Sequence, residues 1–263
     1  MTPVTVTEGA GPLVLGLPHV GTWVPADVGA ALNAEGRKLR DTDWHIDSLY
    51  DGLAGDVTVV RANFHRYVID ANRDPAGVSL YPGQNTTGLV PETDFDGAPI
   101  WDSPVTGTDV AARRAAFHAP YHAALTAQME RVRAAHGVAI LYDCHSIRSH
   151  IPFLFDGVLP DFNLGTNGGT TCDPRLTAAV MARLAGTAHV LDGRFKGGWT
   201  TRHYGRPVEG WHAIQMELAQ SAYLEAEAAP WRMDGAKCAA LHDRLSAILN
   251  DIIALAPELK VTP

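Results

Sequence analysis

Two histidines stand where an apolar run of the sequence gives way to polar residues. His19 follows the run Leu13–Leu17, and His145 ends a run that begins at Val138. Each run reads as a short buried strand, which would deliver its histidine near the carboxyl end. Zinc in hydrolases binds three protein ligands, drawn from histidine and acidic residues, and keeps a fourth position for water. The two imidazoles are therefore candidate ligands of one metal ion, although most of the twelve histidines must be structural or exposed.

A third ligand could come from a group of aspartates. Apolar residues in the stretch 41–53 recur with the spacing of a helix face. On such a helix Asp43, Asp47 and Asp51 would lie at positions i, i+4 and i+8, so that three carboxylates share one stripe. An acidic first turn, which the helix dipole favours, is an equally good reading of Asp43 and Asp47. The residue types alone leave both interpretations open.

Other polar residues at strand ends could act on a substrate or hold it. Glu217 ends a strand-like alternation, where its carboxylate could serve as a general base. Asn72 and Arg73 follow another strand-like run, and an amide beside a guanidinium forms a clamp for a carboxylate. A surface salt bridge is the alternative reading of that pair. The segment 76–104 is rich in Gly, Pro, Asp and Thr, which indicates a lid or a binding loop.

Alternating strands and helices must position these residues. We expect strands at 13–17, 57–60, 67–70, 138–145, 189–191 and 212–218. We expect helices at 26–32, 41–53, 109–136, 174–185 and 234–255, with polar loops at 157–171 and 193–205 and a kink or break at Pro120. This alternation predicts an α/β fold with a mostly parallel mixed sheet and helices on both faces. The active site of such a fold lies at the carboxyl edge of the sheet.

Composition and charge exclude several classes of protein. With 263 residues and 46% hydrophobic content, the chain 1–263 is expected to form one large domain. The net charge of −8 argues against a nucleic-acid partner and against an acidic membrane surface. The sequence also lacks an apolar run of membrane-spanning length and a signal peptide. We therefore expect a small-molecule partner, and the residues do not decide between a monomer and a homodimer.

Three cysteines stand far apart in the sequence, at positions 144, 172 and 238. They are too few and too scattered for a disulfide framework or a four-cysteine zinc site, and an odd number fits a reducing compartment. Cytoplasm is the expected location. Nucleophilic catalysis by Cys144 or Ser146 beside His145 is a weak alternative, because neighbouring residues on a strand point to opposite faces.

Six blocks of sequence, taken together and in order, resemble the N-formylglutamate amidohydrolase family. The blocks are Leu-Pro-His19-Val-Gly, Asp-Thr-Asp43-Trp-His-Ile-Asp-Ser-Leu-Tyr, His-Arg66-Tyr-Val-Ile-Asp-Ala-Asn72-Arg73, Ser-Leu-Tyr81-Pro-Gly-Gln, Asp143-Cys-His145-Ser-Ile-Arg-Ser and Gln-Met-Glu217-Leu-Ala-Gln-Ser-Ala-Tyr. The resemblance implies a zinc-exopeptidase fold like that of metallocarboxypeptidases, with Zn²⁺ or another single divalent metal. It also implies hydrolysis of N-formyl-L-glutamate, a small dicarboxylate, to formate and L-glutamate in histidine degradation.

By position, the resemblance implies a metal set of His19, His145 and an acid of the second block. We choose Asp43, which stands nearer the beginning of that block, and keep Asp47 as the alternative. Glu217 matches the general base. Asp143 could orient a ligating histidine, although capping a loop is an equally good reading of that residue.

The substrate contacts follow from the same resemblance and from the two carboxylates of the substrate. Asn72 and Arg73 are expected to hold one carboxylate, and Arg202, helped by His203 or Lys196, the other. Arg66 is expected to stabilise the oxyanion, and Tyr81 belongs to the expected substrate loop.

Departures from the family pattern are small. His65 stands where serine is expected, and Ala219-Gln220 replaces Asn-Arg after the acid, which could alter the rim of the pocket. Two alternatives remain: an amidohydrolase for another N-acyl amino acid, and a ligand-binding protein of the same fold without catalysis.

Overall fold

The strands of the protein build one central sheet. The structure is a computed structural model that describes residues 1–79 and 83–261. Within these residues seven strands lie in the order β1-β3-β2-β4-β7-β5-β6. Their bounds are β1 Val4–Thr7, β2 Leu13–Leu17, β3 Thr58–Ala62, β4 Ala139–Ile147, β5 Phe162–Gly165, β6 His189–Leu191 and β7 Trp211–Ala219. The pairs β2–β3, β2–β4, β4–β7 and β5–β6 are parallel, whereas β1–β3 and β5–β7 are antiparallel. The predicted mostly parallel mixed sheet is confirmed.

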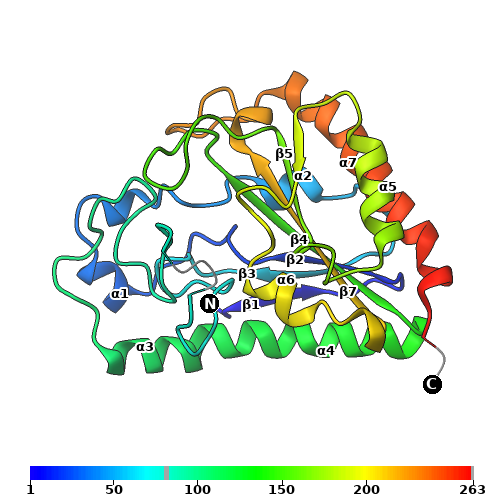
Figure 1. The fold of residues 1–263 in the computed structure, drawn as a ribbon. Coiled ribbons are helices and arrows are strands. Elements are labelled where there is room, and N and C mark those ends of the chain that lie inside the picture. Colours follow the sequence, from blue (N-terminus) through cyan, green and yellow to red (C-terminus); the bar gives the residue numbers. More distant parts are fainter. Residues whose placement is uncertain (80–82, 262–263) are drawn as a thin grey trace.

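Helices cover both faces of this sheet, as Figure 1 shows with α4 on one side and α5 and α7 on the other. The longer helices are α1 Ala26–Ala31, α2 Ile46–Tyr50, α3 Gly107–Arg113, α4 Ala119–His136, α5 Pro174–Leu184, α6 Trp199–Tyr204 and α7 Gly235–Leu255. Short helical turns are η1 Gly36–Lys38, η2 Arg114–His118, η3 Pro207–Glu209, η4 Gln220–Ala222 and η5 Ala256–Leu259. In the described part of the chain, none of the helices combines the length and apolar character needed to cross a membrane.

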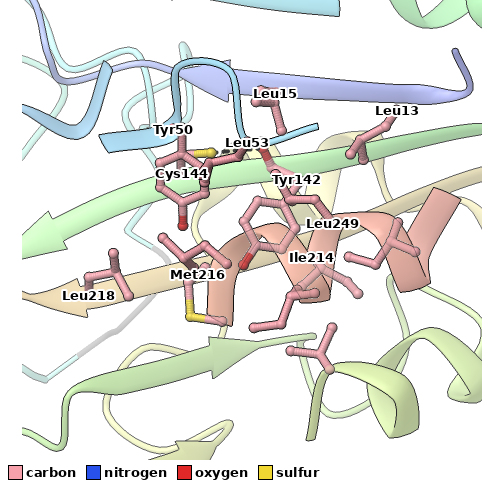
Figure 2. Close-up of a cluster of buried hydrophobic side chains, with 14 of the residues drawn as sticks. Leu13, Leu15, Tyr50, Leu53, Tyr142, Cys144, Ile214, Met216, Leu218 and Leu249 are labelled. Atoms are coloured by element: carbon pink, nitrogen blue, oxygen red, sulfur yellow. Dashed lines mark hydrogen bonds between the residues drawn. The ribbon is translucent and has the colours of Figure 1, made fainter. Parts of the chain in front are cut away.

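Alternate residues of the central strands belong to two apolar layers. On β4, Tyr142 and Cys144 pack with α2, α5 and α7, and Figure 2 shows them among Leu15, Ile214 and Leu249. The side chain of Leu141 points to the opposite face of the sheet and packs with α4. Because side chains alternate along a strand, Asp143 and His145 share the α4 face of the sheet. A strand buried on both faces reads as a continuous apolar run, which is why β4 was recognisable in the sequence.

Four expected elements differ in the structure. The aspartates of 41–53 do not lie on one helix, because His45 adopts a left-handed φ of 60° and α2 begins only at Ile46. The expected strand at 67–70 is absent, because residues 66–68 form a turn and 69–70 are irregular. The expected loops at 157–171 and 193–205 contain β5 and α6, which are too short for periodicity to detect.

At Pro120, where we expected a kink or a break, the helix continues through a π-helical turn. The helical stretch runs through α3, a π-helical turn at η2 and then α4, in which Pro120 lies in the first turn. Proline has no N–H to donate and its ring clashes with the carbonyl four residues earlier, so a widened turn before it removes the conflict. The chain continues in nearly the same direction, as the adjoining α3 and α4 show in Figure 1.

Candidate metal centre and active-site cavity

Three side chains converge at the carboxyl edge of the sheet. His19 Nδ1 lies 3.2 Å from His145 Nδ1, and Asp43 Oδ2 lies 3.7 Å from the first atom and 3.3 Å from the second. All three residues are buried. Tetrahedral ligands at about 2.0–2.1 Å from zinc are separated by about 3.3–3.4 Å. This triangle of two nitrogens and one oxygen therefore has the size and donor chemistry of a divalent metal site.

The strands and the following loops explain this convergence. β2 and β4 are parallel neighbours, so His19, just past the end of β2, lies beside His145 near the end of β4. The backbone N–H of Asp43 donates to the carbonyl of His19 at 3.0 Å. The N–H of Ser146 donates to Asp43 Oδ2 at 3.2 Å. Asp47, the alternative acid, instead pairs with Arg61 at 3.1 Å outside this group.

Each imidazole has a carboxylate behind it. His19 Nε2 lies 2.7 Å from Asp70 Oδ1, and His145 Nε2 lies 3.1 Å from Asp143 Oδ2. Such an acceptor keeps the proton on Nε2 and leaves the lone pair of Nδ1 for a metal. Two Nδ1 lone pairs facing each other at 3.2 Å need a shared cation or a proton between them. The polar atoms around the triangle thus fit a bound divalent ion.

Asp70 is a site residue that the sequence analysis missed. Burial alone would raise the pKa of its carboxyl, but Arg73 and His19 outweigh burial and hold that pKa well below its usual value. Asp70 is therefore charged and suited to orient His19. The one feature of the sequence that could have indicated Asp70 is its position two residues before Asn72, in the block that we selected for the Asn72–Arg73 pair.

Glu217 stands beside the triangle on the neighbouring strand. His145 and Glu217 are directly opposite in the parallel pair β4–β7, and Gln215 Nε2 donates to Glu217 Oε2 at 2.9 Å. Burial and the charge of Asp43 raise the pKa of Glu217 to about 7, although His145 and Arg66 act in the opposite direction. A buried carboxyl with a pKa near 7 can both accept and donate a proton close to neutral pH.

Arg66 is tied to the candidate ligand Asp43. One guanidinium nitrogen donates to Asp43 Oδ1 at 3.1 Å, and the group lies over the ring of Phe95 with its carbon 4.9 Å from the ring centre. Burial would raise the pKa of Asp43, but Arg66 and the two imidazoles hold it below its usual value. Arg66 Nε is buried and has no hydrogen-bond partner among the described residues. Arg66 therefore balances the negative charge of Asp43 at the edge of the triangle.

Asn72 and Arg73 both border the cavity beside the triangle. The amide oxygen of Asn72 accepts from the N–H of Thr200 at 2.9 Å, which leaves the amide nitrogen near His145 Nε2 at 3.2 Å. Arg73 donates from Nε to the carbonyl of Thr87 at 2.9 Å and from a terminal nitrogen to its hydroxyl at 3.0 Å. The segment 76–104 thus contributes to the cavity, as expected of a binding loop.

The cavity extends from the triangle toward a cationic and aromatic rim. Its lining consists of His19, Arg66, Asn72, Arg73, Thr86, Thr87, Phe95, His145, Ser146, Ile147, Leu154, Arg194, Phe195, Gly198, Gln215 and Glu217. Of the expected substrate residues, neither Arg202 nor His203 is in this lining. Tyr81 lies outside the described residues.

Arg202 and His203 do not line the cavity because 199–204 form a helix rather than a loop. On α6, Arg202 Nε donates to the carbonyl of Gly197 at 2.9 Å. The ring of His203 stacks on that of Trp199 with their centres 4.3 Å apart, and both line a different pocket. Arg194, earlier in the same expected loop, lines the cavity instead. The sequence alone could not show which basic residue of this segment lines the cavity, because it did not show which part of the segment is helical.

Fold and site together define an α/β protein with a candidate metal centre at the carboxyl edge of its sheet. The model of the N-formylglutamate amidohydrolase family matches residues 11–224. The chain is 47% identical over 228 residues to the N-formylglutamate deformylase of Pseudomonas aeruginosa, covering 84% of this chain and 85% of that protein. It is 48% identical over 225 residues to the enzyme of the same name in Pseudomonas putida, covering 83% and 84%. The chain belongs to the N-formylglutamate amidohydrolase family.

A solved structure agrees over almost the entire chain. The crystal structure of N-formylglutamate amidohydrolase from Ralstonia eutropha JMP134 matches with a TM-score of 0.81 and 30% identity, and the match covers 98% of this chain and 99% of that one. The fold expected from the sequence is therefore the fold of the family.

Proposed function

We propose that this protein hydrolyses N-formyl-L-glutamate to formate and L-glutamate. The names of the two Pseudomonas relatives and of the Ralstonia structure support this substrate. The observation that carries the proposal is the buried triangle of His19, Asp43 and His145 with Glu217 beside it. The reaction would belong to histidine degradation in the cytoplasm, where three cysteines without disulfide partners would stay reduced. Hydrolysis of another N-acyl amino acid is the alternative.

The triangle would hold Zn²⁺ or another divalent ion, with Asp70 and Asp143 orienting its two imidazoles. A bound ion of this kind lowers the pKa of a water molecule and polarises a carbonyl group. Two nitrogen donors and one oxygen donor suit zinc and its neighbours among the transition metals better than magnesium or calcium, which prefer oxygen.

Glu217 would move the proton that the reaction requires. As a carboxylate it accepts a proton from the attacking water, and as the acid it then protonates the amine nitrogen of the departing glutamate. Without this second transfer the C–N bond would have to expel an unstable amide anion. Its pKa of about 7 suits both steps, and Gln215 fixes the carboxyl by a hydrogen bond of 2.9 Å. Arg66 lines the cavity, and its guanidinium would stabilise the negative charge that develops on the formyl oxygen.

The two substrate carboxylates require separate cationic partners. Asn72 and Arg73 would hold one of them, as expected from the sequence. For the other we propose Arg194 in place of Arg202 and His203, because Arg194 lines the cavity and they do not. Phe195 and Leu154, also in the lining, would pack against the methylene groups between the carboxylates.

The function is tested by measuring L-glutamate release by the purified protein from N-formyl-L-glutamate, which also yields formate, and from N-acetyl-L-glutamate, which yields acetate. We expect the formyl substrate to be strongly preferred, chelation to abolish turnover and added Zn²⁺ to restore it. Glu217→Gln, which keeps the shape of the side chain, should lower kcat by roughly 10²–10⁴-fold while metal content stays unchanged. Full turnover by the chelated protein or by Glu217→Gln would contradict the proposal.

A further inference from the structure

The segment that carries Asp70, Asn72 and Arg73 has no regular secondary structure, yet side chains satisfy its carbonyls. His122 Nε2 lies 2.7 Å from the carbonyl oxygen of Ala71, and His118 Nε2 lies 3.0 Å from that of Arg73. Between them, Arg73 donates to the carbonyl of Asn72 at 3.1 Å. Because buried carbonyls need donors, this segment depends on these side chains for its conformation.

Both histidines come from the start of α4 and its preceding π-helical turn. They stand four residues apart, so they lie on one face of the helical stretch, and both are buried. The widened turn that Pro120 requires changes the phase of the helix at this point, and π-helical turns often accompany functional sites. Arg113 from the same stretch donates to the carbonyl of Val68 at 3.2 Å. The helical stretch therefore supports the loop at several points.

The hydrogen bonds to carbonyl oxygens define which nitrogen of each imidazole carries a proton. A carbonyl accepts only, so Nε2 must carry the proton in each histidine. Burial lowers the pKa of His122 to about 3 and also lowers that of His118, so both rings are neutral near pH 7. The ring of Trp199 packs at 4.7 Å from His122 and 5.7 Å from His118. Neither ring takes part in the proton transfers proposed above.

We propose that His118 and His122 are positioning residues that hold the Asn72–Arg73 carboxylate clamp at the cavity. The hydrogen bonds bracket the clamp, one on the carbonyl before Asn72 and one on the carbonyl of Arg73 itself. This assignment rests on the proposed function, which gives Asn72 and Arg73 their substrate. Loss of either bond would displace the clamp without removing any group that contacts substrate.

The test compares an asparagine and a glutamine variant at each of positions 118 and 122, because the two side chains differ in length. The amide nitrogen of glutamine stands where histidine has Nε2, whereas that of asparagine is too short. We expect His118→Asn and His122→Asn to raise KM for N-formyl-L-glutamate about tenfold or more with little change in kcat, because misplaced binding groups weaken binding before they affect chemistry. His118→Gln and His122→Gln should restore KM to near the wild-type value. His136→Asn is the matched control, since His136 on the same helix bonds the distant carbonyl of Ala10 at 2.7 Å.

Calorimetric binding of L-glutamate provides a readout without turnover. In an Arg73→Ala background, His118→Asn should add little to the loss of affinity, because the side chain whose backbone His118 holds is already gone. Additive losses, or wild-type KM in both asparagine variants, would overturn the positioning role. If an asparagine variant does not fold, the methionine variant at that position replaces it. A wild-type protein that neither turns over the formyl substrate nor binds L-glutamate would instead refute the proposed function.

Discussion

At the scale of single residues, the site depends on imidazoles that are each held between two carboxylates. His19 has Asp43 on one nitrogen and Asp70 on the other, and His145 has Asp43 and Asp143. Asp70 and Asp143 hold the Nε2 side of the two rings and so fix the ring orientation in the triangle. A preformed triangle loses little conformational entropy when it binds an ion.

Replacing Asp70 tests this arrangement. Asp70→Asn keeps the size of the side chain but removes the charge that orients His19 Nε2, so we expect metal affinity to fall by roughly 10–100-fold. Competition with a chromogenic chelator measures that affinity. Asp47→Asn is the control, because Asp47 pairs with Arg61 outside the triangle and its loss should leave metal affinity unchanged. Equal affinities in both variants would argue against an orienting role for Asp70.

The pH dependence follows from Glu217. A general base works only when ionised, and the pKa of Glu217 is raised to about 7, so kcat/KM should fall as the pH decreases through about 7. Gln215 donates to the charged form of this carboxyl, which favours ionisation. Gln215→Leu removes the donor and should move the acidic limb of the profile to higher pH. If the acidic limb of the pH profile does not move in this variant, a group other than Glu217 controls it.

At the scale of elements, the beginning of α6 sets the position of the Asn72 amide. The N–H of Thr200 holds the amide oxygen, and Gly198 lies so close that a β-carbon there would overlap the Asn72 side chain. Gly198 has φ of −77°, which alanine adopts without strain, so a substitution tests contact rather than backbone conformation.

Gly198→Ala should therefore displace Asn72 and lower kcat/KM by roughly 10²-fold, the loss expected when a binding group moves by about 1 Å. Steady-state kinetics at fixed metal loading measures the effect. Gly235→Ala is the matched control, because Gly235 also opens a helix, α7, and a β-carbon at that position meets no atom within 4 Å. Similar kinetics in the two variants would contradict the proposed contact between α6 and Asn72.

At the scale of the whole molecule, one sheet joins two apolar layers. His145 and Glu217 point from β4 and β7 to the face of the sheet that packs with α4. Helices α5 and α7 cover the other face (Figure 1). We propose that the chain unfolds as one domain, because both layers share the central strands β2, β4 and β7. Stability and catalysis should then be separable by substitutions on the face remote from the site.

Leu249 provides that test. It is fully buried between α7 and the sheet (Figure 2), and Leu249→Ala should lower the free energy of unfolding by about 2–5 kcal/mol through lost burial and a cavity. Urea denaturation should show a single transition, with kcat of the folded protein unchanged. Val208→Ala, at a position that is 87% exposed, should stay within about 0.5 kcal/mol of wild type. Two separate transitions would contradict a single domain.

Much of the architecture was readable from the sequence because it is recorded in local patterns. The strands β2, β4 and β7 are apolar runs, and α5 and α7 have helical periodicity, so their existence and order could be predicted. Placing His19, His145 and Glu217 at one edge needed only the rule that parallel strands end on the same side. The choice of Asp43 came from its position in a family block, and the structure brings it, not Asp47, to the histidines.

Only the tertiary structure decided which residues of irregular segments face the cavity. Whether Arg194 or Arg202 lines the cavity depends on where α6 begins. The role of Asp70 depends on the irregular conformation of 67–70, where the sequence pattern predicted a strand. The bonds from His118 and His122 join segments 45 to 51 residues apart. Strands and helices with a periodic pattern of apolar residues can be predicted from local sequence. The conformation of a loop instead depends on hydrogen-bond donors and acceptors that are distant in sequence, and these meet only after the sheet and helices have packed.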